Sequence, residues 1–196
     1  FIIMDRPQKG EERPLHIIKH FRTITHHRHL VMKNCFKVGL YWRGLTHDLS
    51  KYSPTEFWRG AKYYQGTFSP TQQERRDKGY SLAWMHHKGR NRHHFEYWTD
   101  VSPVTRQYVP LEMPTRFFVE MCMDRIAASS TYLGKDYHDG APLEYLLRAG
   151  DNRWMHPVTA RKLRYILTML RDRGEEETFR FIREVVLKEL PFAGEE

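Results

Sequence analysis

Residues 17–51 read IIKHFRTITHHRHLVMKNCFKVGLYWRGLTHDLSK, and this segment does the most to set the architecture of the chain. Its first part carries apolar side chains at helical spacing, which predicts one long amphipathic helix over about residues 14–40. The remainder predicts a second helix over residues 40–51. The apolar stripe of the first helix consists of Ile17, Phe21, Ile24, Val31 and Val38.

Most of the other segments also have helical patterns. The clearest helix start is Ser53-Pro54-Thr55-Glu56, in which Ser53 can cap, Pro54 fits the first helical position and Glu56 completes a capping box. Glu56 is therefore interpreted as a cap rather than a catalyst. No alternating strand and no hairpin signal is found. The expected fold is an all-α bundle. Further helices are expected over residues 53–65, 81–88, 114–133, 157–173 and 175–190, with a loop or irregular helix over 67–79 and loops over 103–110 and 134–151.

Length and composition narrow the class of protein. The 196 residues suit one compact domain, and no apolar run approaches the roughly 20 residues that a membrane-spanning helix needs. The two cysteines, Cys35 and Cys122, are too few for a disulfide scaffold and are expected to be buried thiols. A reducing, cytoplasmic location is therefore expected.

Positive charge and histidine are concentrated in the first half of the chain. Residues 1–100 hold 18 Lys and Arg against 9 Asp and Glu, whereas residues 101–196 hold 14 against 15. The first half also contains 10 of the 12 histidines. An excess of positive charge attracts phosphates, nucleic acids and other anions. The expected partner is an anionic small molecule, with a nucleic acid or a merely soluble basic surface as the alternatives.

Three groups of histidines, two of them with carboxylates nearby, have the composition of a metal site. His27 shares the apolar face of the first helix, whereas its neighbour His26 is expected to be solvated. His47 and Asp48 are adjacent on the next predicted helix, about 100° apart, so both can reach a pocket beside it or bridge two metals. His is the commonest transition-metal ligand, and Asp supplies oxygen donors. Asp124 lies on an apolar helical face and requires either a core arginine or a metal.

Two further pairs of histidines flank Gly89. They are His86 with His87 and His93 with His94, close to the cationic residues Lys88, Arg90 and Arg92. Four imidazoles so close together are costly unless a metal or an anion organises them, and the alternative is a pH-sensitive surface loop. The sequence leaves open which histidine of each pair points inward.

The order of these residues carries a family resemblance. His27, then His47-Asp48, then the two His pairs, then Asp124 resembles the HD superfamily of metal-dependent phosphohydrolases, whose ligands follow the order H…HD…H…H…D. Residues 44–57 and 84–98 also look like an uncharacterised family of small HD-like proteins. The resemblance implies an HD-like helical core over residues 14–135. An N-terminal extension (1–13) would precede it, and a loop with two extra C-terminal helices (136–196) would pack on it.

The resemblance also implies roles for individual residues. One or two divalent ions (Mn, Fe, Ni, Co or Mg) would be held, and a metal-bound water would be the nucleophile. Lys51, Arg90 and Arg92, with Asn91 beside them, would bind the substrate phosphate, and His94 would join Lys51 and Arg90 in catalysis. His27, His47, Asp48 and Asp124 would form the central metal site. Asp48 would also belong to a second site, which His87 and His94 would complete. His86 and His93 are the alternatives to His87 and His94.

Two other functions compete with a phosphohydrolase. Some HD-like proteins are two-iron oxygenases with the same ligand order and more histidine, which fits the richness in His here. A nucleic-acid or partner-binding module with a structural metal is the non-enzymatic alternative, and the basic half of the chain would supply its salt-dependent binding. Trp84, Tyr97 or Trp98 could stack a base, although large aromatic side chains more often fill a core.

Overall fold

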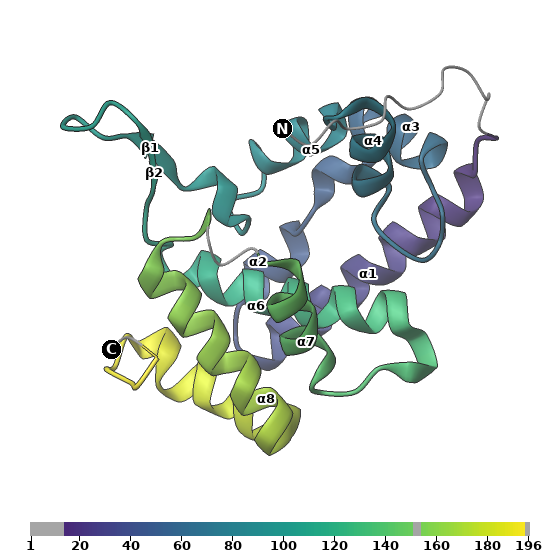
Figure 1. The fold of residues 1–196 in the computed structure, drawn as a ribbon. Helices are drawn as coiled ribbons and strands as arrows, with labels where there is room; N and C mark the ends of the chain where they lie inside the picture. The colour runs from purple at the N-terminus through teal and green to yellow at the C-terminus, as the bar shows by residue number, and fades with distance from the viewer. Residues whose placement is uncertain (1–13, 151–153, 195–196) are drawn as a thin grey trace.

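The computed structural model describes residues 14–150 and 154–194, and this part of the chain has the expected all-α fold (Figure 1). The extension predicted over residues 1–13 lies outside the described residues. Among these residues, no helix has the length and apolar character needed to cross a membrane. The α-helices are α1 (Ile17–Lys37), α2 (Tyr41–Thr46), α3 (Pro54–Lys62), α4 (Pro70–Lys78), α5 (Leu82–Lys88), α6 (Thr115–Leu133), α7 (Ala141–Ala149) and α8 (Pro157–Glu184). The 3-10 helices are η1 (Leu49–Tyr52), η2 (Phe95–Tyr97), η3 (Gly134–Asp136) and η5 (Val186–Lys188), and the strands are β1 (Thr99–Val101) and β2 (Tyr108–Pro110).

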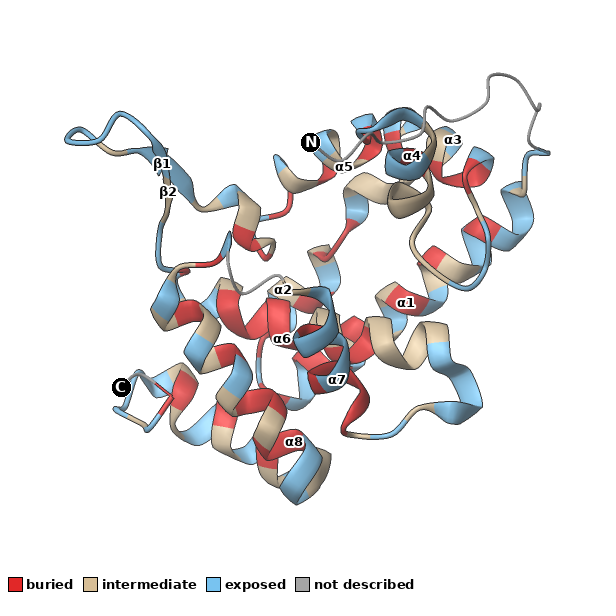
Figure 2. Cartoon of the chain, in the orientation of Figure 1, coloured by how far each residue is buried: buried red, intermediate tan, exposed pale blue. Residues whose placement is uncertain are grey.

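The core forms where α1 and α6 pack together, with α7 and α8 against α6 (Figures 1 and 2). Val31 of α1, Phe118 of α6 and Leu163 of α8 are among its fully buried side chains. Burying a large apolar side chain of this kind stabilises the fold by about 1.5–3 kcal/mol. The two central helices are therefore held rigidly, and they carry His27 and Asp124.

A second group of helices, α3 to α5, lies over the N-terminal half of α1. The fully buried Glu74 of α4 connects them: its carboxylate accepts hydrogen bonds from Arg59 at 3.0 Å, from the Ser81 hydroxyl at 2.6 Å and from the Ala83 amide at 3.3 Å. Ser81 in turn accepts from the Trp84 amide and caps α5. These bonds fix where α5 begins, and with it the position of the histidine pair at its end.

The prediction of no hairpin is wrong. β1 and β2 pair antiparallel, with Thr99 opposite Pro110, in a hairpin that projects from the body of the protein (Figure 1). β1 is exposed at all three positions, so the sequence contains no alternation of buried and exposed residues that could reveal it.

The loop predicted over residues 134–151 contains α7, so this prediction is wrong as well. Leu143 and Leu146 are buried one turn apart, and this short apolar spacing was the available signal. The region 67–79, expected as a loop or irregular helix, contains α4. The predicted boundary between the last two helices is confirmed, because Gly174 breaks α8 with a φ of 79°, but the second part ends at Glu184 instead of residue 190.

Candidate metal centre

The first pair of candidate ligands comes from the two central helices. His27 lies on the buried face of α1, as the helical phase predicts, and Asp124 lies on α6. His27 Nε2 is 2.9 Å from Asp124 Oδ1, and His47 Nε2 is 3.5 Å from the same oxygen. Imidazoles therefore surround the Asp124 carboxylate. One of the two alternatives from the sequence was a core arginine at this place.

The segment that carries His47 and Asp48 is not helical, so the prediction of one helix over residues 40–51 is wrong. α2 ends just before His47, and Asp48 adopts the left-handed conformation with a φ of 54°. That conformation is uncommon for a residue other than glycine and costs on the order of 1–3 kcal/mol. Arg28 holds the break, donating from Nε to the His47 carbonyl at 2.7 Å. As a result, the side chains of His47 and Asp48 point to the same place.

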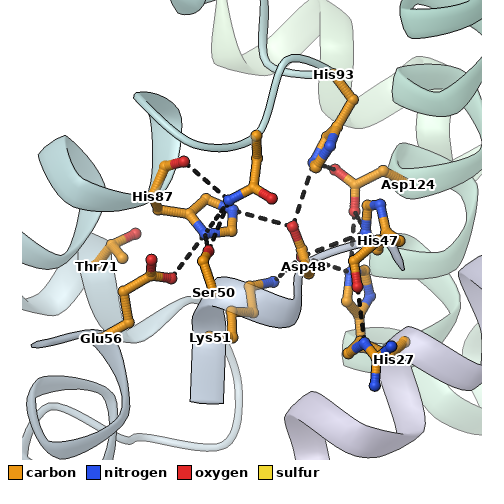
Figure 3. A network of polar contacts seen from close by, with 12 residues as sticks. His27, His47, Asp48, Ser50, Lys51, Glu56, Thr71, His87, His93 and Asp124 are labelled. Atoms are coloured by element: carbon orange, nitrogen blue, oxygen red, sulfur yellow. Dashed lines mark hydrogen bonds and ion pairs between the residues drawn. The ribbon is translucent and has the colours of Figure 1, made fainter. Parts of the chain in front are cut away.

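Asp48 lies between two groups of histidines (Figure 3). Its Oδ2 is 3.2 Å from His47 Nε2 and 3.8 Å from His27 Nε2. Its Oδ1 faces the other way, 3.3 Å from His87 Nε2 and 3.5 Å from His93 Nε2. The two oxygens of one carboxylate thus serve two different sets of imidazoles.

Within the described residues, donor atoms that lie within 4.8 Å of one another form three overlapping sets that could hold a metal ion. Asp48 belongs to the first two of them. Both His93 and His94 are included, but of the other pair only His87, whose Nε2 lies 3.3 Å from Asp48 Oδ1, belongs to a set. The sets are His27, His47, Asp48 and Asp124; Asp48, His87, His93 and His94; and His47, His93 and Glu120.

Two buried carboxylates stand behind the histidines. Glu120 Oε1 lies 2.9 Å from His47 Nδ1 and 3.2 Å from His93 Nδ1. The two oxygens of Glu56 lie 2.6 Å from His86 Nδ1 and 2.7 Å from His87 Nδ1. A carboxylate in this position favours the proton on Nδ1 and leaves the Nε2 lone pair free for a metal.

The roles of Glu56 and Glu120 differ from those that the sequence patterns indicate. The capping box predicted for Glu56 is wrong, because its carboxylate binds the two histidines and the Ser53 side chain makes no capping hydrogen bond. Glu120 was not singled out at all. The available signal was its spacing, because it lies four residues before Asp124 and so shares a helical face with that candidate ligand.

The unsatisfied atoms of the centre fit a bound cation. Asp48 forms ion pairs with His47 and Lys51, and His27 with Asp124. Even so, the Nε2 atoms of His27, His47, His93 and His94 and both oxygens of Asp48 are buried and have no hydrogen-bond partner of suitable geometry within the described residues. Leaving such a group unpaired costs about 1–3 kcal/mol each, so buried polar atoms are normally satisfied. A divalent metal would satisfy these donors together, so the residues present fit such an ion.

The charge states also suit a metal. Burial opposes ionisation of Asp48 and Asp124, but their histidine neighbours, together with Lys51 beside Asp48, hold both pKa values well below the ordinary range. Burial, reinforced by His93 and His87, holds the pKa of His94 well below its usual value. At neutral pH the centre therefore offers ionised carboxylates and a neutral imidazole, which are the forms that bind metals.

Metal affinity is expected to rise with pH. Burial would lower the pKa of His47 and His87, but the charge of Asp48 outweighs it and raises both pKa values in the metal-free protein. Below those pKa values the imidazoles are protonated and must lose a proton to bind a metal. The affinity should change by about tenfold per pH unit for each proton released. Competition with a chelator between about pH 6 and 8 measures this slope. A slope of zero would contradict the expectation, and exchanging the exposed His138 for asparagine should leave the slope unchanged.

The residues expected to bind substrate are divided between two places. Lys51 lies at the centre, with Nζ 2.6 Å from Asp48 Oδ2. Asn91 is nearly buried and donates to the Ser50 hydroxyl at 2.7 Å and to the His87 carbonyl at 2.9 Å, which ties the loop after α5 in place. Arg90 and Arg92 are exposed and line a separate cavity together with His93.

Of the three aromatic side chains considered for base stacking, only Trp84 contacts the centre. Its ring centroid lies 4.7 Å from that of His94 and 5.7 Å from that of His87. Tyr97 and Trp98 pack against each other at 5.3 Å, and Trp98 also packs against Phe117 of α6. Trp84 therefore forms a wall of the candidate site, whereas the other two connect the following loop to α6.

Comparison with known protein families gives a match that covers most of the chain. The model of a family described as a family of unknown function (DUF5662) matches residues 16–169. The matched region contains every candidate ligand from His27 to Asp124. No curated protein and no solved structure matches the chain.

Proposed function

The chain belongs to this family of unknown function, DUF5662, and from the chemistry of its buried centre we propose that it is a metal-dependent phosphohydrolase. The observation that carries the proposal is the position of Asp48, whose two oxygens face two sets of imidazoles. A carboxylate shared in this way is what a pair of neighbouring metal ions requires, and paired ions are a common device for displacement at phosphorus.

The donors suit transition metals better than magnesium. Imidazole favours Zn, Cu, Fe and Ni, whereas Mg prefers oxygen donors and water. When bound, the metals would lower the pKa of a water molecule and polarise a phosphoryl oxygen. His27, His47, Asp48 and Asp124 would hold one ion, and Asp48, His87, His93 and His94 the other.

The chain's own residues support the handling of a phosphate. Lys51 is at the accessible edge of the centre, with 29% of its side chain exposed against 1% for Asp48. Burial opposes its charge, but Asp48 and Asp124 outweigh burial and raise its pKa, so the ammonium stays charged. It is placed to bind a phosphoryl oxygen and to offset negative charge that develops there. Trp84 packs against His87 and His94.

The order of the candidate ligands along the chain also supports the proposal through its resemblance to the HD superfamily. That resemblance extends to two-iron oxygenases, which share the ligand order. The two reactions differ in the metal they need and in whether they consume oxygen, so both can be decided in one experiment.

The test is the metal content of protein purified without a His tag, followed by assays on a panel of phosphoesters. We expect one or two equivalents of manganese or a redox-silent metal per chain. We also expect release of phosphate from a nucleoside monophosphate, a triphosphate or a cyclic nucleotide, lost on chelation and restored by metal. Two irons per chain with oxygen consumption would instead indicate an oxygenase. No metal even after it is added back would overturn the centre itself.

A further inference from the structure

A polar cavity lies beside His93, next to the candidate metal centre. The Nε2 atom of His93 faces Asp48 at 3.5 Å, while its Nδ1 atom faces Glu120 at 3.2 Å, and His93 and Glu120 both line this cavity. The imidazole ring therefore separates the cavity from the candidate metal ions. Its volume is about 220 Å³, and its lining consists of Arg43, Thr46, Arg90, Asn91, Arg92, His93 and Glu120.

Positive charge exceeds negative charge in the lining. The lining contains three arginines and a single carboxylate, Glu120. Glu120 Oε1 already contacts two imidazoles, and its Oε2 lies 3.7 Å from Arg43 Nη1. Within residues 14–150 and 154–194 no carboxylate forms an ion pair with Arg90 or Arg92. Arg90 donates to the His86 carbonyl at 3.4 Å, and Arg92 lies over the Tyr97 ring at 5.6 Å. Among the described residues, these two guanidinium groups therefore have no carboxylate counter-charge of their own beside the cavity.

We propose that this cavity is a binding site for a phosphoryl dianion that is separate from the metal centre. Guanidinium groups present N–H donors in a planar fork that matches the oxygens of phosphate, and such charge-assisted bonds are among the strongest in proteins. The three arginines and Glu120 together carry a net charge of +2, which balances the −2 charge of a phosphoryl dianion. The cavity has room for a phosphoryl group with a few water molecules.

The proposal does not depend on hydrolysis, because the guanidinium groups that would bind the anion are not candidate metal ligands. Its test is therefore made on metal-free protein kept in a chelator. Inorganic phosphate is titrated by calorimetry at constant ionic strength, with chloride as the comparison anion. A nucleoside monophosphate is titrated in the same way, which distinguishes free phosphate from a phosphoryl group carried on a nucleotide.

We expect saturable binding of one phosphate per chain. The double variant Arg90→Gln with Arg92→Gln should lose it, because each charge-assisted bond contributes about tenfold in affinity. Both side chains are exposed, so this variant is expected to fold normally. Arg43→Gln should weaken binding to a similar degree per residue. The matched control is Arg148→Gln on α7, an exposed arginine that lies over Tyr145 at 5.9 Å as Arg92 lies over Tyr97.

Three results would overturn the proposal. The first is the absence of saturable phosphate binding to the metal-free protein. The second is equal weakening by Arg148→Gln, which would indicate general attraction to a basic surface. The third is binding that requires added metal and disappears in Asp48→Asn, which would assign the anion to the metal centre. Tighter binding of the nucleotide than of phosphate would support the same site and identify a nucleotide as the source of the phosphoryl group.

Discussion

Replacing Asp48 by asparagine is expected to remove both metal ions and, with them, the proposed phosphohydrolase activity. Asp48 is the one residue common to the two sets of four donors, and each of its oxygens faces a different set. Loss of a carboxylate behind a metal ligand costs about 10–100-fold in affinity or activity, and loss of a shared ligand should exceed that range. Metal content by elemental analysis and the rate of phosphoester hydrolysis measure the two effects.

Asparagine is the appropriate replacement because it tolerates the left-handed backbone that Asp48 adopts. Alanine at this position would add backbone strain to the loss of the charge and so confuse the interpretation. As companions, His27→Ala should lose the first ion alone and His87→Ala the second alone, because each belongs to one set. If Asp48→Asn retained one full equivalent of metal, Asp48 would not be shared and the two-ion arrangement would be wrong.

The sequence predicted the helices that form the scaffold of the site because their apolar spacing is regular. The phase of α1 placed His27 inward and His26 outward, and both are where that phase puts them. What failed was the segment between helices. The helical period of 3.6 residues in the sequence continues from α2 through His47 and Asp48, but the helix itself ends before His47. The non-helical conformation there is stabilised by Arg28, which is nineteen residues away from His47 in the sequence.

The same limit applies to the choice among the histidine pairs. Helical phase could not decide between His86 and His87 because both share faces with apolar neighbours. The structure decides it through Glu56, which binds Nδ1 of both rings but leaves only His87 directed at Asp48. Partners 30 or more residues apart determine these orientations, and a periodic pattern in one segment contains no information about them.

Glu120→Ala is expected to weaken the binding of both metal ions, whereas Glu56→Ala should weaken the binding of only one. The two carboxylates form a matched pair, since each is buried and each holds two imidazoles through Nδ1. They differ in which rings they hold. Glu120 reaches His47 in the first donor set and His93 in the second, but Glu56 reaches only His87 among the candidate ligands. Each loss should cost about 10–100-fold in affinity for the ions concerned.

The decisive readout is the number of ions affected, measured by stepwise titration of metal into apo protein while circular dichroism monitors the fold. General destabilisation would act on both variants alike, because both delete a buried carboxylate of similar environment. If Glu120 positions the imidazole rings, the titration of Glu120→Ala should show two metal-binding steps of lower affinity, whereas that of Glu56→Ala should show one. Glu120→Gln should recover part of the loss, because an amide oxygen can still accept from an imidazole N–H. If Glu120→Ala weakened a single step, the two donor sets would not be coupled through this carboxylate.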